Sequence, residues 1–206
     1  MIKSTYPFTE RTLVLMKTDA VMRGLVGEIL LRFERVGLKI IALKIVQPTP
    51  EQAKNHYSTS DAQLNQMGNK TLETYKSLGI DPLKQLGTVS SLEIGKIVHG
   101  WNIEFLSAGP AVALVLEGVH AIKKVRSLCG KTMPKDAEPG SIRGDFSSSS
   151  PAVANMLNSA VYNLVHASDN ENDPNEPQRE IDNWFSSSEL VEYNNVDSSV
   201  MFKLGK

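Results

Sequence analysis

The chain is poor in the features that mark several large classes of protein. Its 206 residues contain one cysteine, Cys129, which excludes an internal disulfide and indicates a reducing compartment. No apolar run approaches the roughly 18–20 residues of a membrane span. The N-terminus lacks the basic-then-apolar pattern of a signal peptide. The net charge of −1 argues against a nucleic-acid binder that relies on bulk positive potential. We therefore expect a cytoplasmic protein that binds neither membranes nor nucleic acids.

The sequence also lacks the motifs of the common phosphate-handling enzymes. It has no G-x-x-x-x-G-K-[ST] sequence, which excludes a P-loop mechanism. Neither the protein-kinase glycine loop nor its H-R-D motif occurs. No cluster of metal ligands with a recognisable spacing is visible. What is present is an ordinary globular composition, 41% apolar and 22% charged, long enough for one large domain with a full core.

The order of periodic segments predicts an α+β fold. The strand-like segments are residues 12–17, 38–46 and 111–116, and the helical ones are residues 24–37 and 119–129. Thr49 opens a segment that resembles a capping box and predicts a short helix toward Tyr57. Strand–helix–strand, a helical excursion and again strand–helix–strand give a βαββαβ order. For this order we expect an antiparallel sheet with helices on one face.

Two stretches interrupt this pattern. Residues 58–99 are polar and have two helical patches, which Gly79 and a following Asp-Pro pair end. We interpret them as an inserted helical hairpin, because about 42 residues could hardly form an independent core without a metal or disulfides. Residues 147–161 open with a serine run and continue as an extra loop and helix. We expect one domain, residues 1–206, that carries both insertions.

His166 has the most informative surroundings. In the segment NLVHASD, residues 163–169, small and hydroxyl side chains follow the histidine directly and leave room for a group to reach its ring. Imidazole has a free pKa of roughly 6.5 and is largely neutral, hence nucleophilic, at pH 7. Nearby arginines would complete a site that moves a phosphoryl group onto the ring. An isolated histidine is more often a core residue, but the neighbouring motifs favour the catalytic interpretation.

Six segments resemble the nucleoside diphosphate kinase family, in the family's order. The family pattern E-R-T-x-x-x-x-K-P-D-G-V-x-R-G-L-x-G-E is similar to residues 10–28, and S-G-P-V-V-A-M-V-x-E-G is similar to residues 108–118. The other segments are residues 126–134, 139–146, 163–169 and 180–185. The resemblance implies a ferredoxin-like sandwich, which agrees with the βαββαβ order. It also implies transfer of the γ-phosphoryl group of ATP to nucleoside diphosphates by a ping-pong mechanism through phosphorylated His166.

The resemblance implies roles for further residues. Glu180 would hold one ring nitrogen of His166 so that the other is presented, and Ser168 would support this pair. Lys17 would lie near the ribose and the transferring phosphate. The residues expected to bind the nucleotide are Lys17, Tyr57, Arg126, Thr132, Arg143 and, through a ribose hydroxyl, Asn163. Mg²⁺ would arrive on the nucleotide, because it prefers phosphate oxygens and water, so no metal site made by the protein is expected.

Some of the residues expected to bind phosphate also have an alternative, structural interpretation. Arg126 and Arg143 would hold phosphate oxygens through fork-like hydrogen bonds, and Thr132 would add a hydroxyl donor. A solvated helix face is the alternative for Arg126, and core packing is the alternative for Tyr57. The remaining histidines, which we interpret as structural or surface residues, are His56, His99 and His120.

The sequence departs from the family in several positions. Thr18 and Ala20 replace a proline and a glycine, and Ala167 replaces a glycine, which would strain the site if that position needs a positive φ. The family's base-stacking phenylalanine has no counterpart, because the 58–99 insertion occupies its place. A non-catalytic nucleotide-binding regulatory module with a modified base-binding lid is therefore the alternative function, and the insertions could also serve assembly. The resemblance implies a homo-oligomer, a dimer-based tetramer or hexamer.

Overall fold

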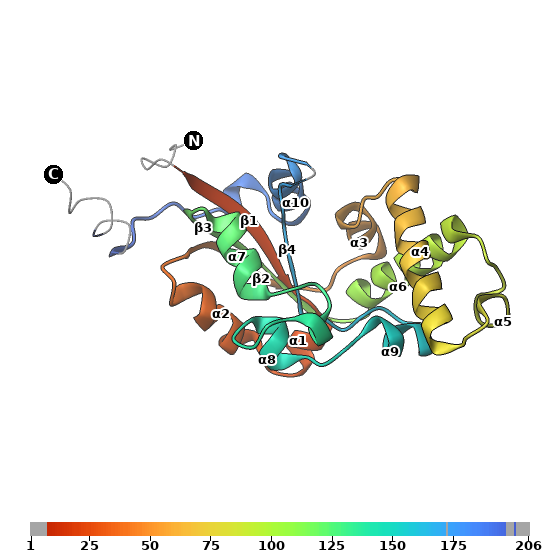
Figure 1. Ribbon diagram of the computed structural model, residues 1–206. Coiled ribbons are helices and arrows are strands. Elements are labelled where there is room, and N and C mark those ends of the chain that lie inside the picture. The colour runs from red at the N-terminus through yellow and green to blue at the C-terminus, as the bar shows by residue number, and fades with distance from the viewer. Residues whose placement is uncertain (1–7, 172, 197–199, 201–206) are drawn as a thin grey trace.

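The computed structural model describes residues 8–171, 173–196 and 200. In this part of the chain, a four-stranded antiparallel sheet has the order β2-β3-β1-β4. The strands are β1 (Thr9–Met16), β2 (Lys39–Val46), β3 (Ala111–Val119) and β4 (Val165–Ala167). The ends of the expected 1–206 domain lie outside the described residues. Figure 1 shows the strands at the centre of the molecule, with a group of helices standing off one end.

Helices connect the strands in the predicted βαββαβ order. Outside the connection from β2 to β3, the helices are α1 (Thr18–Met22), α2 (Val26–Glu34), α7 (Ala121–Cys129), α8 (Ile142–Phe146), α9 (Pro151–Met156) and α10 (Glu176–Trp184). Between β2 and β3 lie α3 (Pro50–His56), α4 (Asp61–Leu78), α5 (Pro82–Leu86) and α6 (Ser91–Ser107). Short 3₁₀ helices span Pro134–Asp136 and Ser187–Glu189. The expected ferredoxin-like α+β fold is confirmed. Among the described residues, no helix has the length and apolarity needed to cross a membrane.

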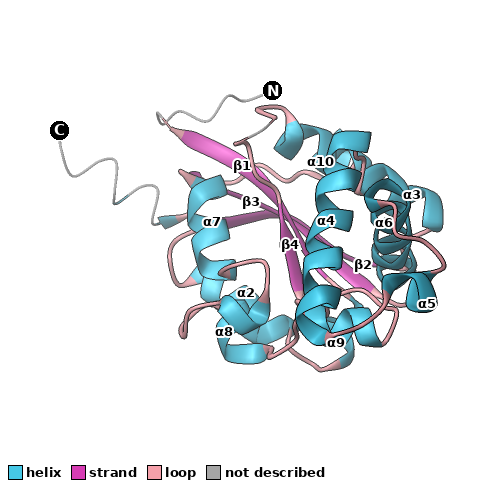
Figure 2. Ribbon diagram, turned by 45° about the vertical axis from the view of Figure 1, so that its right-hand side comes forward, coloured by secondary structure: helices cyan, strands magenta, loops and turns pink. Residues whose placement is uncertain are grey.

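Helices cover both faces of the sheet, so the expectation of one covered face is wrong. Leu13 and Leu15 of β1 pack against residues of α3, α6 and α10, whereas Val14 and Met16 pack against residues of α2 and α7. Figure 2 shows α2, α7 and α8 on one side of the strands and α3, α4 and α6 on the other. The reason lies in the strands themselves. β1 and β3 carry consecutive buried apolar residues, and a sheet with two apolar faces must be covered twice.

Local sequence signals set several helix boundaries as predicted. The Thr49 hydroxyl oxygen accepts the backbone N–H of Gln52 at 3.1 Å, and a proline occupies the first turn of α3. Ser150 caps α9 in the same way. Gly79 ends α4 with φ +67°, a conformation that glycine adopts without a Cβ clash. These boundaries depend only on neighbours in the chain, which is why the sequence indicates them.

The helices α4 and α6 pack against each other and form the α4–α6 hairpin, which contains most of the stretch 58–99. The two helical patches expected within 58–99 belong to one continuous helix, because Gly68 between them packs against α6 and does not end α4. A Cβ atom at Gly68 would clash with the carbonyl oxygen of Ser91, and one at Gly95 would clash with that of Leu64. The two helices therefore meet backbone to backbone at these two glycines.

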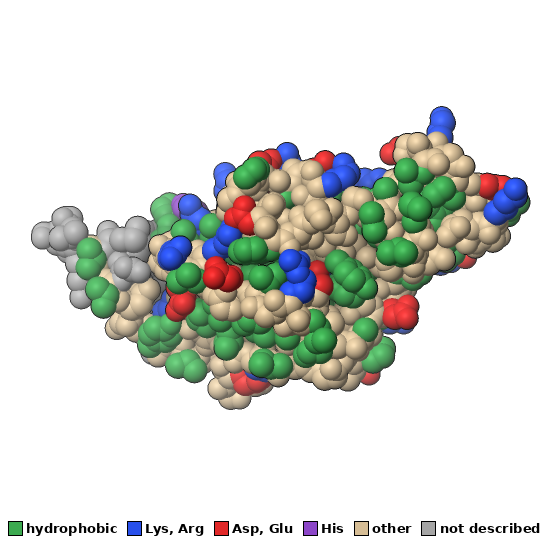
Figure 3. Space-filling model, turned by 90° about the horizontal axis from the view of Figure 1, so that it is seen from below, with side chains coloured by type: hydrophobic (Ala, Val, Ile, Leu, Met, Phe, Trp, Pro, Cys, Tyr) green, Lys and Arg blue, Asp and Glu red, His purple; other side chains and the backbone are tan. Residues whose placement is uncertain are grey.

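Exposed apolar side chains lie on α1, on α2 and the turn after it, and on the edge strand β2. They are Met22, Leu31, Val36, Leu43 and Ile45, of which Met22 and Ile45 are each 73% exposed. Figure 3 shows hydrophobic side chains gathered among charged ones on the underside of the molecule, where α1, α2 and α8 lie in Figure 1.

Candidate active site

Strand geometry places His166 among the helices of one face. His166 lies opposite Leu15 in the pairing of β1 with β4, and residues directly opposite each other share a face of the sheet. Leu15 belongs to the face covered by α3, α6 and α10. His166 therefore points toward these helices, whereas Val165 and Ala167 belong to the other core. Because β4 is a short edge strand, the His166 side chain keeps 21% of its surface exposed.

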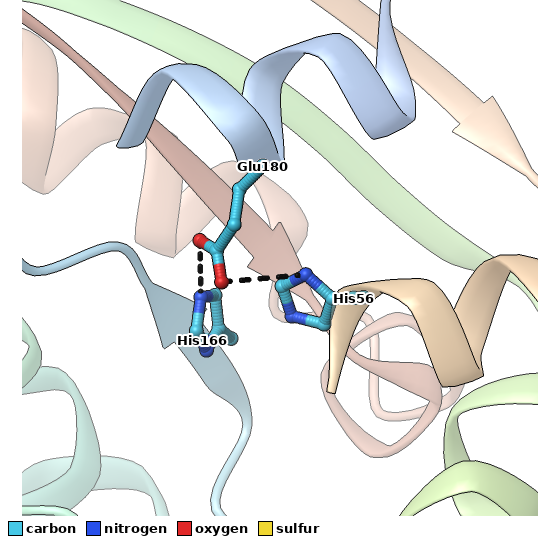
Figure 4. Close-up of side chains that lie close together, drawn as sticks. All are labelled: His56, His166 and Glu180. Atoms are coloured by element: carbon cyan, nitrogen blue, oxygen red, sulfur yellow. Dashed lines mark hydrogen bonds and ion pairs between the residues drawn. The ribbon is translucent and has the colours of Figure 1, made fainter. Parts of the chain in front are cut away.

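Glu180 holds one nitrogen of the His166 ring. Its Oε2 lies 2.8 Å from Nε2 of His166 and also accepts the hydroxyl hydrogen of Ser168, at an oxygen–oxygen distance of 2.5 Å. Glu180 and Trp184 are four residues apart on α10, so both side chains point toward the sheet. Once Nε2–H is donated to the carboxylate, the lone pair of Nδ1 is left for a substrate. Figure 4 shows the Glu180 carboxylate reaching the His166 ring from α10.

Burial keeps the His166 ring neutral. Desolvation, reinforced by the cations of Lys17 and Arg143, lowers the pKa of His166 to about 3. The Asp169 carboxylate acts in the opposite direction on the pKa of His166, and burial raises the pKa of Glu180. The imidazole is therefore uncharged near pH 7, which is the protonation state that can attack phosphorus.

Lys17 follows β1 directly and reaches the loop before His166. Its Nζ donates to Oδ1 of Asn163 at 2.8 Å, and the Asn163 amide nitrogen donates to the carbonyl oxygen of Thr132 at 3.0 Å. Burial, with Arg143 nearby, lowers the pKa of Lys17 to about 8. The Lys17 ammonium also lies 5.9 Å from the centre of the Tyr57 ring. The structure thus brings together Lys17, Tyr57, Thr132 and Asn163, four of the residues singled out in the sequence.

Arg143 is buried beneath the same loop. Its Nε donates to the carbonyl oxygen of Asn163 at 3.1 Å, and its two Nη atoms donate to those of Gly130 and Val165, each at 2.6 Å. A guanidinium has five N–H bonds, so two of them stay available for a phosphate. Arg143 therefore fixes the backbone on both sides of the loop while it can still bind an anion.

Arg126, in contrast, lies at the surface. Its side chain is 42% exposed, and Nη1 lies 3.2 Å from Oδ2 of Asp169 and 3.5 Å from the carbonyl oxygen of Ala167. A groove of about 920 Å³ runs beside it, lined also by Lys123 and Lys131. A phosphate that binds Arg126 must share it with Asp169 or displace that carboxylate. Both interpretations of Arg126, phosphate ligand and solvated helix residue, are compatible with this position.

The loop between Asn163 and His166 contains a strained residue. Leu164 has φ +67°, in the left-handed region that side chains other than glycine rarely adopt. Its N–H donates to Oδ2 of Asp19 at 3.0 Å, and its carbonyl oxygen accepts the backbone N–H of Lys17 at 2.8 Å. Such strain persists only where the surroundings over-determine the conformation. Asp19 thus positions the loop, a role that its place two residues after Lys17 could have indicated.

The structure decides between the alternatives that the sequence left open at two further positions. Ala167 lies in the extended strand β4 and is not among the described residues with positive φ, so its methyl group does not strain the site. His56, interpreted as a structural or surface residue, is buried against the site. Its ring centre lies 4.3 Å from that of His166, and its Nδ1 lies 3.6 Å from Oε1 of Glu180. Its place directly before Tyr57, an expected site residue, could have indicated that His56 lies near the site.

The cluster of His56, His166 and Glu180 has the donor types of a metal site, but the atoms that face one another in it already form hydrogen bonds. One ligand atom from each residue lies within 4.8 Å of the others. His56 Nδ1 accepts the indole N–H of Trp184 at 3.4 Å, and Oε2 of Glu180 accepts from Ser168 and His166. Two ligands of one tetrahedral ion lie roughly 3.3 Å apart. That is wider than the 2.8 Å between His166 and Glu180, so we describe the cluster as a hydrogen-bond network.

Comparisons with known proteins agree with this geometry. A family model described as nucleoside diphosphate kinase matches residues 10–71 and 91–190. It leaves residues 72–90, within the 58–99 stretch, unmatched. The nucleoside diphosphate kinase of Pyrobaculum aerophilum is 46% identical over 183 residues, which are 89% of this chain and 98% of that protein. A crystal structure of an NDP kinase from the same organism has a TM-score of 0.84 at 45% identity and covers 89% of this chain and 100% of that one.

Two further solved structures are similar over nearly the whole chain. A transition-state mimic of the nucleoside diphosphate kinase from Borrelia burgdorferi, with bound vanadate and ADP, has a TM-score of 0.73 at 35% identity. It covers 94% of this chain and 96% of that one. A halophilic nucleoside diphosphate kinase from Halobacterium salinarum, in complex with CDP, has a TM-score of 0.64 at 30% identity and covers 94% and 99% of the two chains.

Proposed function

The chain belongs to the nucleoside diphosphate kinase family and is a phosphotransferase with that activity, and from this premise we propose that His166 carries the phosphoryl group. Nδ1 of His166 attacks the γ-phosphorus of a nucleoside triphosphate. The N–P bond forms as the bond to the bridging oxygen breaks, and the electron pair leaves with the diphosphate. A phosphate oxygen of a second nucleoside diphosphate then takes the phosphoryl group and frees the ring. The observation that carries the proposal is the neutral His166 ring held at Nε2 by Glu180.

Glu180 and Ser168 control the charge of the ring during transfer. As Nδ1 bonds to phosphorus, the ring gains positive charge, and the carboxylate 2.8 Å from Nε2 stabilises it. The Ser168 hydroxyl donates to the same carboxylate oxygen and keeps it in place. Both partners are already in position in the free protein, so little reorganisation is needed when the reaction occurs.

The cations around the His166 loop are proposed to bind the nucleotide phosphates. Arg143 keeps two N–H bonds beyond its three carbonyl contacts, and Lys17 presents a buried ammonium. Arg126 and Thr132 are both exposed, and they would complete the phosphate site. Tyr57 would border the phosphates, and Asn163 would bind a ribose hydroxyl. The ADP and CDP bound by the two similar structures support nucleoside diphosphates as ligands.

The residues present fit a magnesium ion that is held by the nucleotide. Glu180 accepts from His166 and Ser168, Asp169 pairs with Arg126, and Asp19 accepts the N–H of Leu164. These carboxylates are therefore engaged, and Mg²⁺ often keeps phosphate and water oxygens as its ligands. When bound, the ion would neutralise charge on the phosphates while Lys17 and Arg143 orient them.

Self-association and cellular location are further parts of the proposal. We infer that the chain forms a homo-oligomer, a dimer-based tetramer or hexamer, through the exposed apolar residues of α1, α2 and the edge strand β2. Light scattering would give the mass, and a monomer at micromolar concentration would contradict the inference. We also propose that residues 1–206 act as one domain with additions at 58–99 and 147–161. A cytoplasmic location stays a prediction, which cell fractionation would test.

The test of the phosphohistidine compares His166→Ala with His120→Asn. His120 is exposed and has φ +51°, a conformation that asparagine tolerates, so this control removes an imidazole without straining the backbone. Each protein is mixed with ATP, an acid-labile adduct is sought by intact mass, and GDP or CDP is then added. We expect the control to behave as the unaltered protein and His166→Ala to form neither adduct nor product. Undiminished transfer in His166→Ala would overturn the proposal.

A further inference from the structure

His56 carries a buried polar atom that has no partner among the described residues. The residue ends α3 and is only 3% exposed. Its Nε2 has no hydrogen-bond partner in the described part of the chain. An unpaired buried donor or acceptor destabilises a folded protein, so such atoms are few in native structures. The atom therefore needs an explanation.

The partners of the other ring nitrogen identify this atom as a donor. The indole N–H of Trp184 can only donate, and it lies 3.4 Å from Nδ1 of His56. Nδ1 must then accept, which places the ring hydrogen on Nε2. Oε1 of Glu180 lies 3.6 Å from the same Nδ1, beyond a normal hydrogen bond. Burial also lowers the pKa of His56 well below its usual value, so the ring is neutral.

The unpaired N–H lies beside the ring of His166, the residue proposed to carry the phosphoryl group. The rings of His56 and His166 meet edge to face, with centres 4.3 Å apart and planes at 85°. Figure 4 shows the second nitrogen of the His56 ring on the side that faces His166. The next residue in the chain, Tyr57, carries the ring beside which the Lys17 ammonium lies. The end of α3 thus lies at the same site as Lys17, which follows β1, and His166 of β4.

We propose that His56 is a further catalytic residue, whose Nε2–H donates to an oxygen of the phosphoryl group while that group is bound to His166. This inference rests on the proposed phosphohistidine. A phosphoryl group brings several strongly accepting oxygens and negative charge into a buried space, where a preorganised donor acts most strongly. The donor is unpaired before transfer and gains its acceptor only with the phosphoryl group. Its effect therefore falls on the transition state and the phosphorylated protein, not on nucleotide binding.

Three substitutions separate this role from packing. His56→Gln can place an amide N–H near the position of Nε2, His56→Asn can place an amide near that of Nδ1, and His56→Phe keeps a ring with neither. We expect the Asn and Phe variants to phosphorylate His166 about 100-fold more slowly, with the KM for ATP changed by less than about threefold. His56→Gln should recover most of the rate. At a fixed ratio of ATP to ADP, the fraction of phosphorylated protein should fall in the Asn and Phe variants alone.

Other outcomes would overturn the inference. A rate retained by His56→Asn and lost by His56→Gln would show that His56 only accepts the Trp184 N–H. An unchanged rate in His56→Phe, or losses in all three variants with an unchanged phosphorylated fraction, would also exclude the donor role. If a His56 variant does not fold, Trp184→Phe serves instead. This change frees the ring hydrogen to move to Nδ1, so a lower phosphorylated fraction is expected, and an unchanged fraction excludes the role. An unaltered protein without any adduct would instead refute the phosphohistidine itself.

Discussion

The cluster around His166 and the α4–α6 hairpin are held together in opposite ways. In the cluster, buried polar side chains such as Arg143 and Glu180 are each fixed by two or three hydrogen bonds. In the hairpin, the closest contact is made where side chains are missing, at Gly68 and Gly95. The cluster therefore depends on hydrogen-bond geometry, and the hairpin depends on shape. Substitutions in the first should change chemistry, and substitutions in the second should change stability.

Arg143→Lys is the substitution for which we expect the largest effect. One ammonium cannot reach the three carbonyl oxygens that the guanidinium serves, and a buried group left unpaired costs about 1–3 kcal/mol. We expect the free energy of unfolding to fall by about 3 kcal/mol and phosphoryl transfer to fall by about 100-fold. Chemical denaturation and steady-state kinetics measure the two effects.

Arg126→Lys is the matched control for this residue, because Arg126 pairs with Asp169 at the surface. Its transfer rate should fall, while its stability should stay within about 0.5 kcal/mol of the unaltered protein. Equal destabilisation by the two changes would show that the carbonyl contacts of Arg143 contribute little. The cluster would then be less dependent on its hydrogen bonds than the structure indicates.

Gly95→Ala tests whether substitutions in the α4–α6 hairpin change stability but not chemistry. The added methyl group meets the backbone of Leu64, and overpacking of this kind costs about 1–3 kcal/mol. The folded protein should still phosphorylate His166 at a rate within about threefold of normal, because no member of the cluster is touched. Thermal unfolding and the mass of the adduct are the measurements.

Gly100→Ala is the control on the same helix. A Cβ at Gly100 meets no atom within 4 Å, so alanine should be neutral or stabilise α6 by up to about 1 kcal/mol. Loss of phosphorylation in a stably folded Gly95→Ala protein would contradict the distinction between the His166 cluster and the hairpin. It would show that the hairpin takes part in the chemistry as well as in packing.

The change of kcat/KM for ATP with pH should be the smallest of these effects, and it should come from the titration of Lys17 alone. Its pKa is lowered to about 8, so the cation needed for phosphate is present below pH 8 and is lost as the pH rises. His166, with its pKa lowered to about 3, stays neutral throughout this range. The kcat/KM for ATP reports the free protein, and we expect it to be flat from pH 5 to 7 and to fall about fivefold between pH 8 and 9.

Lys17→Arg should remove this alkaline fall, because a guanidinium stays charged. The rate itself can be lower in this variant, since an arginine does not fit the Asn163 contact in the same way. An acid limb near pH 6 in the unaltered protein would contradict the assignment. It would show that His166 titrates near its free pKa and is less desolvated than its buried position indicates.

The sequence predicts more of the fold than of the contacts within the site. Thr49 caps α3 and Gly79 ends α4 as expected, because caps involve residues a few positions apart. The grouping of Lys17, Arg143 and Asn163 around His166 also agrees with the segments singled out in the sequence. The sequence pattern led us to expect helices on one face of the sheet only, although the consecutive apolar residues of β1 and β3 indicate that both faces are covered.

His56 shows why the rest could not be predicted. Its hydrogen-bond partner Trp184 is 128 residues away, and the two meet only because α3 and α10 cover the same face of the sheet. The place of His56 directly before Tyr57 indicates that it lies near the site, but it does not indicate which ring nitrogen is left unpaired. Likewise, the partner of Asp19, Leu164, is 145 residues away and is identified only by the tertiary structure.

By itself, the sequence determined the strand and helix order, the helix caps and the set of residues available for phosphoryl transfer. These follow from periodicity and from short-range hydrogen bonds. Only the tertiary structure decided that Glu180 holds Nε2 of His166, that Leu164 adopts a strained conformation, and that His56 has an unpaired N–H. Those features arise where strands and helices distant in the chain pack together, and burial there determines which polar atoms find partners.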